Sequence, residues 1–115
     1  MVETSDEWIR TRTGIQERHI SSAEQATSDL AYEAAVKALA NAGMTAEDLD
    51  LIIVASVTPD HAFPSTGCVL QRRLGASKAF CFDLSAACSG LLYSLETAYS
   101  MLKARDKYKN ALVIG

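Results

Sequence analysis

A short apolar run with three consecutive β-branched residues lies near the middle of the chain, Leu-Ile-Ile-Val-Ala-Ser at residues 51–56. The run shows no alternation between apolar and polar side chains, so a strand formed here has two apolar faces. Such a strand is stable when other elements cover both of its faces, as in a parallel sheet flanked by helices. The chain is therefore expected to form a layered α/β fold.

The remaining segments predict helices and strands in an order that suits this fold. Apolar spacing and the positions of Ser, Thr and Gly predict where each element begins and ends. Helices are expected after a cap at Thr4 or Ser5 up to Gly14, after a cap at Thr27 or Ser28 up to Gly43, and at 65–74 and 90–105, with a helical turn at 45–48 and further strands at 79–84 and 111–115. In the last helix a core-facing stripe is expected, formed by Leu91, Leu92, Leu95, Ala98, Tyr99 and Leu102. The connections have the length that right-handed parallel crossovers need.

Composition excludes several classes of protein. With 115 residues, 49% of them hydrophobic, the chain can form a packed core. A net charge of -3 argues against nucleic-acid binding, which needs a basic face. No apolar run is long enough to cross a membrane and no secretory signal begins the chain, so a cytoplasmic protein is expected. The end within an apolar strand leads us to expect a fragment of a longer protein.

Cys88 is a candidate nucleophile because it lies where the strand at 79–84 turns into the helix at 90–105. Backbone N–H groups and the positive end of the helix dipole favour a thiolate there, and the thiolate is the nucleophilic form. Small neighbours let another molecule approach the sulfur and let N–H groups face a developing oxyanion; they are Ala86, Ala87, Ser89 and Gly90. The residues alone leave open that Cys88 is a small buried residue, which is how Cys68 and Cys81 are interpreted. Their spacing predicts neither a disulfide framework nor a metal site.

Three motifs carry a resemblance to a known family. They are T-S-D-E-W-I-x-T-R-T-G-I-x-E-R-H-I at 4–20, H-A-F-P-S at 61–65 and D-L-S-A-A-C-S-G-L at 83–91, followed by A-L-V-I-G at 111–115. In this order they resemble the N-terminal portion of the beta-ketoacyl-acyl-carrier-protein synthase III family of condensing enzymes, over essentially the whole chain. The resemblance implies the N-terminal half of a thiolase-like layered fold. Residues 1–115 would then be a partial domain that lacks the family's first strand and its C-terminal half.

The resemblance also implies a reaction in two steps. An acyl group passes from acyl-CoA to Cys88, and malonyl-acyl-carrier protein then loses carbon dioxide and attacks the acyl-enzyme, which starts fatty-acid synthesis. Coenzyme A thioester is a substrate, no cofactor is expected, and a homodimer is implied. The family's catalytic His and Asn come from its later half. His19 and His61 belong to other motifs, and Asn41 and Asn110 lie at helix and loop ends, so none of them is assigned these roles. This chain alone is therefore expected to be inactive.

Family resemblance assigns further site residues. Trp8 matches a residue that stacks on adenine, Arg12 one that lies by the phosphates, and Thr4 a weaker contact; an aromatic ring and a guanidinium suit these roles. Without the motif, a half-buried Trp and solvated surface arginines would be the simpler interpretation. Phe63 is implied to cross a two-fold dimer interface and line the partner's acyl pocket, although it could also plug its own core. Leu91 stands where many relatives carry Phe, so the acyl chain length stays open.

Two other functions share the nucleophile segment or the scaffold. One is a related condensing enzyme of polyketide, quinolone or hydroxymethylglutaryl-CoA synthesis, and the other is a non-catalytic binding or dimerisation module. The motifs at 4–20 and 61–65 favour the synthase III function over the related enzymes. An intact Cys88 with small neighbours argues against a module that only binds.

Overall fold

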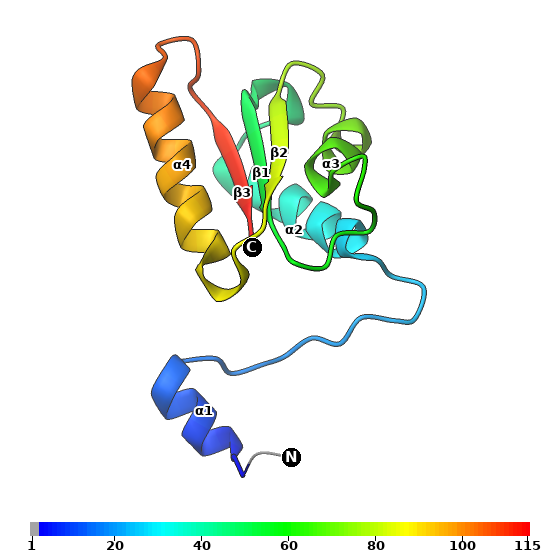
Figure 1. Ribbon diagram of the computed structural model, residues 1–115, viewed down its shortest axis with the longest axis vertical. Coiled ribbons are helices and arrows are strands. Elements are labelled where there is room, and N and C mark those ends of the chain that lie inside the picture. The colour runs from blue at the N-terminus through cyan, green and yellow to red at the C-terminus, as the bar shows by residue number, and fades with distance from the viewer. Residues whose placement is uncertain (1–2) are drawn as a thin grey trace.

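The computed structural model describes residues 3–115, and the elements in this range follow the predicted order (Figure 1). The helices are α1 (Asp6–Thr13), α2 (Thr27–Ala42), α3 (Thr66–Leu74) and α4 (Gly90–Ala104), the 3-10 turns are η1 (Ala46–Asp48) and η2 (Ala87–Ser89), and the strands are β1 (Leu51–Ala55), β2 (Phe80–Leu84) and β3 (Ala111–Ile114). Most predicted ends differ from these by about one residue, which is the usual uncertainty of helix and strand boundaries.

The three strands form one parallel sheet in the order β2-β1-β3. Leu51 at the start of β1 is paired with Phe80 of β2 on one side and with Ala111 of β3 on the other. Because all three strands run in the same direction, their carboxyl ends lie at one edge of the sheet. The predicted parallel α/β fold is confirmed.

Strand β1 is buried on both faces, as its apolar run predicts. Ile52 and Val54 belong to the core cluster that includes α2 and α3, whereas Leu51 and Ile53 belong to the cluster that includes α4. All four side chains are at most 1% exposed. Burying a side chain of this kind contributes roughly 1.5–3 kcal/mol, so β1 anchors both layers of helices.

Serine caps the start of two helices, and glycine follows the end of three, where the sequence predicts them. The Ser5 hydroxyl accepts a hydrogen bond from the backbone N–H of Trp8 at 3.1 Å, and the Ser65 hydroxyl accepts one from that of Cys68 at 3.2 Å. Glycines in the left-handed conformation follow α1, α2 and α3. Only glycine adopts this conformation at little cost, so each of these glycines marks the point where its helix ends.

The predicted cap of α2 is wrong. Ala26 occupies the cap position, and the carboxylate of Asp29 accepts a hydrogen bond from its backbone N–H at 2.9 Å. Neither Thr27 nor Ser28 caps the helix; both lie within it, and the Thr27 hydroxyl instead donates to the carbonyl of Thr58 in the loop after β1. The helix therefore begins one residue earlier than a Ser/Thr cap requires, because a tertiary contact takes the hydroxyl.

The predicted core stripe of α4 is also wrong for most of its length within this chain. Among its members Ala98 is buried, while Leu91, Leu92, Leu95 and Tyr99 are 45–67% exposed. The buried face of α4 consists of Gly90, Ser94 and Ala98, spaced four residues apart. These small residues let the helix lie close to the sheet, and the broad apolar face points away from it. Leu30 of α2 is half exposed as well.

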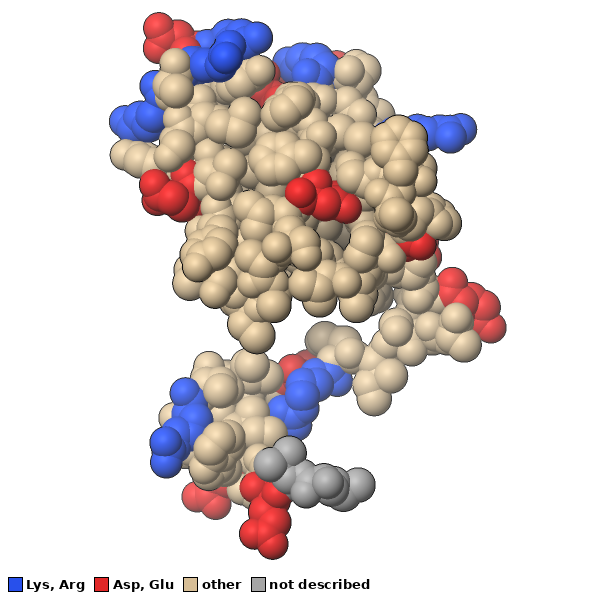
Figure 2. Space-filling view, in the orientation of Figure 1, with Lys and Arg blue, Asp and Glu red and all other residues tan. Residues whose placement is uncertain are grey.

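The molecule consists of a layered body and a separate N-terminal helix (Figure 1). In the body, α2 and α3 lie on one side of the sheet and α4 on the other. An extended segment connects α2 to α1, which lies beyond the carboxyl edge of the sheet. Charged side chains gather at the opposite end of the body in this view, whereas the end nearest α1 shows few of them (Figure 2).

Candidate functional site

Cys88 lies in a sharp turn between β2 and α4. Ala87, the residue before it, has a φ of 46°, in the left-handed region that residues other than glycine rarely adopt. The backbone N–H of Ser89 donates to the carbonyl of Ala86 at 3.1 Å, and Gly90 continues directly into the helix. The Cys88 side chain is exposed, so the alternative of a buried packing residue is not supported within this chain. The turn presents the sulfur beside the N-terminus of a 15-residue helix.

A glycine at the start of α4 sets the distance between this turn and the sheet. A Cβ atom on Gly90 would lie 3.1 Å from the Cβ of Ala55, at the end of β1. Larger residues would push the helix away from the sheet. The small side chains around Cys88 thus let the backbone N–H groups of the turn lie at the carboxyl edge, where loops of parallel sheets form binding sites.

The other two cysteines lie together on the face of β2 that packs against α3. Their Sγ atoms are 3.4 Å apart, and both residues are half-buried. Burial, together with the neighbouring Cys68 sulfur, raises the pKa of Cys81 to about 12. A thiol with such a pKa is almost entirely protonated at neutral pH and is a poor nucleophile. These properties agree with the packing role expected for Cys68 and Cys81.

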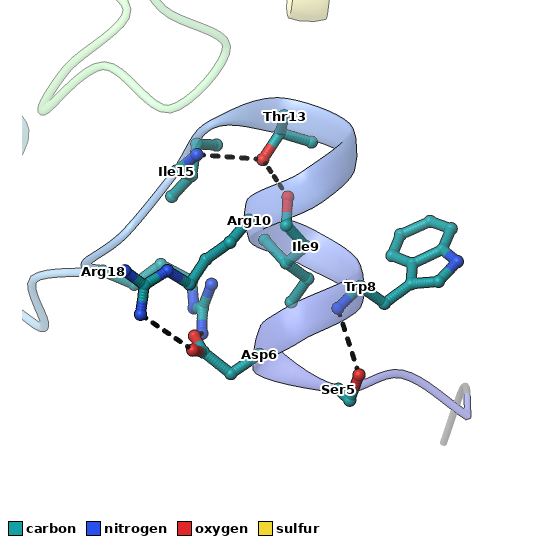
Figure 3. Close-up of polar contacts among 8 residues, drawn as sticks. All are labelled: Ser5, Asp6, Trp8, Ile9, Arg10, Thr13, Ile15 and Arg18. Atoms are coloured by element: carbon teal, nitrogen blue, oxygen red, sulfur yellow. Dashed lines mark hydrogen bonds and ion pairs between the residues drawn. The ribbon is translucent and has the colours of Figure 1, made fainter.

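Helix α1 brings Trp8 and Arg12 together. The Arg12 guanidinium carbon lies 5.4 Å from the centre of the Trp8 ring, which is itself 53% exposed. Arg10 and Arg18 instead form ion pairs with Asp6 at 3.5 and 3.9 Å, on the side of the helix away from the indole (Figure 3). Within residues 3–115 Arg12 makes no ion pair, so its charge is available for a ligand.

The remaining predicted site residues lie on exposed segments, and of these Phe63 lies in a loop at the carboxyl edge of the sheet. Thr4 is exposed just before α1, and Phe63 is 89% exposed in the loop that follows β1. The turn with Cys88 also lies at this edge, but α1 stands beyond it across the extended segment (Figure 1). The structure thus brings Trp8 and Arg12 into contact, while Cys88 and Phe63 occupy separate loops.

No metal centre is apparent in the part of the chain that the structure describes. Between residues 3 and 115 no three His, Cys, Asp or Glu side chains are grouped so that they could hold a metal ion. His19 lies 3.8 Å from Glu17 on the extended segment, and His61 is exposed in the loop after β1. Among the same residues, none of the helices combines the length and the apolar character that crossing a membrane requires.

Asp83 lies five residues before Cys88 and has no role predicted from the sequence. Its carboxylate accepts two backbone hydrogen bonds from the start of α3. The one signal in the sequence is a carboxylate inside an otherwise apolar strand, Phe-Cys-Phe-Asp-Leu. A charged residue in such a place needs partners, but the sequence does not reveal which ones.

Comparison with known proteins points to one family. Residues 82–115 match the family model described as 3-oxoacyl-[acyl-carrier-protein] synthase III. Over 115 residues the chain is 55% identical to a protein of Fusobacterium nucleatum named beta-ketoacyl-[acyl-carrier-protein] synthase III, and over 114 residues it is 57% identical to one of the same name from Clostridium perfringens. These matches cover 100% and 99% of the chain and 35% of each relative.

Solved structures agree with the sequence comparison. The crystal structure of 3-oxoacyl-[acyl-carrier-protein] synthase III from Aquifex aeolicus superposes with a TM-score of 0.80 at 51% identity, and the match covers 96% of this chain and 35% of that one. The chain thus spans about a third of the length of the curated relatives it matches. The family resemblance and the layered fold predicted from the motifs are confirmed.

Proposed function

We propose that this chain carries the acyl-accepting part of a beta-ketoacyl-[acyl-carrier-protein] synthase III. The premise is that the chain corresponds in sequence and fold to the N-terminal third of this family. The observation that carries the proposal is the exposed Cys88 thiol at the turn into α4, inside the segment that the family model matches. The complete polypeptide would start fatty-acid synthesis from a short acyl-CoA.

In the first step the Cys88 thiolate attacks the carbonyl carbon of the acyl-CoA thioester. The carbonyl oxygen becomes an oxyanion, which backbone N–H groups at the N-terminus of α4 are suited to stabilise. When the carbonyl forms again, the bond to the coenzyme A sulfur breaks and the coenzyme leaves as a thiolate. The acyl group is then held on Cys88 as a new thioester, with no net oxidation or reduction.

Helix α1 is the proposed site for coenzyme A. The exposed indole of Trp8 offers a face on which adenine can stack, and the neighbouring Arg12 offers a planar cation for phosphate oxygens. Thr4, exposed just before the helix, adds a hydroxyl. Arg10 and Arg18, the other two arginines of this region, both form ion pairs with Asp6. This difference supports Arg12 as the phosphate ligand.

Phe63 is proposed to line the acyl pocket of a partner subunit in a homodimer. Its side chain is 89% exposed, which leaves it free to enter a neighbouring molecule and argues against a plug in its own core. The acyl chain length that the enzyme accepts would then depend on the dimer. The second step, in which malonyl-acyl-carrier protein loses carbon dioxide and attacks the acyl-enzyme, requires a His and an Asn from outside residues 1–115.

The chain is therefore proposed to be one part of a longer enzyme that works in the cytoplasm and uses coenzyme A thioester as a substrate, with no further cofactor. Residues 1–115 by themselves are expected to show no condensing activity. Their role is to supply the nucleophile, the coenzyme contacts and one wall of the acyl pocket.

Labelling of the complete polypeptide with radioactive acetyl-CoA tests the proposal. Label is expected on the segment 83–105, and it should disappear in Cys88→Ser. Full labelling of that variant would exclude Cys88 as the acyl acceptor. Discharge of the acyl-enzyme by malonyl-acyl-carrier protein, and not by acetoacetyl-CoA, is the expected second result; the reverse would assign the chain to a related condensing enzyme.

A further inference from the structure

Asp83 is a half-buried carboxylate in an otherwise apolar edge strand. Side chains of β2 alternate between the two faces of the sheet, so Phe82 and Leu84 pack on the α4 side, and Cys81 packs on the side of α2 and α3. Asp83 shares the face of Cys81 and points toward α3. A carboxylate in this place is stable only if hydrogen-bond donors replace the water that it loses.

The donors are the first two backbone N–H groups of α3. The Asp83 Oδ2 atom accepts from Thr66 N at 2.7 Å, and its Oδ1 atom accepts from Gly67 N at 2.7 Å. Both N–H groups lack partners inside the helix, and the positive end of the helix dipole favours a negative charge there. Charge-assisted bonds of this length are among the stronger hydrogen bonds in proteins.

Gly67 shows how closely α3 approaches the strand at this point. A Cβ atom at this position would lie 3.2 Å from the carbonyl oxygen of Phe82 and 3.3 Å from Oδ1 of Asp83. A second backbone atom of β2, Phe82 N, would lie 3.3 Å away, and neither backbone atom can rotate away. A larger residue would therefore push α3 and β2 apart by a few tenths of an ångström and lengthen the hydrogen bonds of the carboxylate.

This double hydrogen bond, which we name the Asp83 clamp, connects two segments of the proposed active site. On one side it holds the start of α3, three residues after Phe63. On the other side it holds the end of β2, five residues before Cys88. The pocket-lining loop and the nucleophile turn are otherwise separate loops, 25 residues apart in the sequence at Phe63 and Cys88.

We propose that Asp83 is a positioning residue of the acyl-transfer reaction: the clamp fixes the Phe63 loop to the sheet edge that carries the Cys88 turn, and so sets how Phe63 enters the acyl pocket of the partner subunit and the shape of that pocket. The inference rests on the proposed function. It predicts that weakening the clamp changes which acyl groups reach the sulfur, and not only how much folded enzyme is present.

The test compares kcat/KM for acylation by acetyl-CoA and by butyryl-CoA in the complete polypeptide. The ratio of the two values does not depend on the fraction of active enzyme, so a merely structural loss leaves it unchanged. In Asp83→Asn we expect the ratio to change by about fivefold or more, because misplacing groups near the reacting atoms by about 1 Å can cost on the order of 100-fold in rate.

Asp50→Asn is the matched control. Asp50 also accepts two backbone N–H groups, from Lys109 at 2.8 Å and Asn110 at 3.1 Å, but it lies before β1 at the opposite edge of the sheet. The Asp50→Asn variant should lower the melting temperature as Asp83→Asn does. It should leave the ratio of kcat/KM for acetyl-CoA and butyryl-CoA unchanged. Gly67→Ala, which forces the helix and strand apart without altering the carboxylate, should change the ratio as Asp83→Asn does, and it decides the matter if Asp83→Asn does not fold.

An unchanged ratio in Asp83→Asn and Gly67→Ala would overturn the inference while the proposed function stands. An equal change in Asp50→Asn would overturn it as well, because general loosening would then explain the effect. If the wild-type protein accepts no acyl group on Cys88, the proposed function itself fails, and this inference fails with it.

Discussion

Alkylation of the three thiols by iodoacetamide at pH 8 should separate Cys88 sharply from Cys81. The raised pKa of Cys81, about 12, leaves about one sulfur in 10,000 as thiolate at this pH, compared with about one in four for an unperturbed cysteine with a pKa near 8.5. A more basic thiolate is intrinsically more nucleophilic, and this raises the reaction rate of the Cys81 thiolate by about 40-fold. Cys81 should therefore react about 60-fold more slowly than an unperturbed thiol, and partial burial slows it further. The exposed Cys88 beside a helix N-terminus should react at least as fast as an unperturbed thiol.

Mass spectrometry of chymotryptic peptides measures the two rates, because cleavage after Phe82 separates Cys81 from Cys88. Raising the pH from 8 to 10 should accelerate Cys81 strongly, since its thiolate fraction rises about tenfold per pH unit below its pKa. Cys68→Ala removes the neighbouring sulfur that helps to raise this pKa, so it should accelerate Cys81 and leave Cys88 unchanged. Equal rates for Cys81 and Cys88 in the unmodified protein would refute the reasoning about the nucleophile.

Three further perturbations test the fold and the site. Ile52→Ala, at a side chain with no exposed surface, should lower the free energy of unfolding in urea by about 2–5 kcal/mol, whereas Val57→Ala, at a 58% exposed side chain, should change it by less than about 0.5 kcal/mol. Ser5→Ala removes the cap of α1 and should cost that helix about 1 kcal/mol, visible as lower helicity and altered fluorescence of Trp8; unchanged spectra would argue against the cap. Two backbone N–H groups before β3 lower the pKa of Asp50 below its ordinary value of 3.8, so the stability from its carboxylate is complete above about pH 4 and is lost as the pH falls below it. The difference in melting temperature between wild type and Asp50→Asn should accordingly be larger at pH 7 than at pH 3.

Local patterns in the sequence were sufficient for the helices, the strands and several of their ends. The run at 51–56 predicts a buried parallel strand because a strand with two apolar faces has few other stable positions. Ser65 and Gly75 predict the ends of α3 because a side-chain cap and a left-handed residue act over three or four neighbouring residues. The three motifs likewise predict the family, and the proposed site residues Cys88 and Trp8 follow from the motifs rather than from any single residue type.

Contacts between segments far apart in the chain could not be predicted in the same way. Nothing local to β2 indicates that it forms an edge of the sheet, that the sulfurs of Cys68 and Cys81 lie 3.4 Å apart, or that Asp83 accepts hydrogen bonds from the start of α3. The burial of α4 is a second example. The same spacing of leucines is found on a helix face that the chain covers and on one that stays exposed, so the sequence does not distinguish the two. A pattern in the sequence specifies which side chains avoid water. Only the packing of the strands and helices in three dimensions decides what each of them meets.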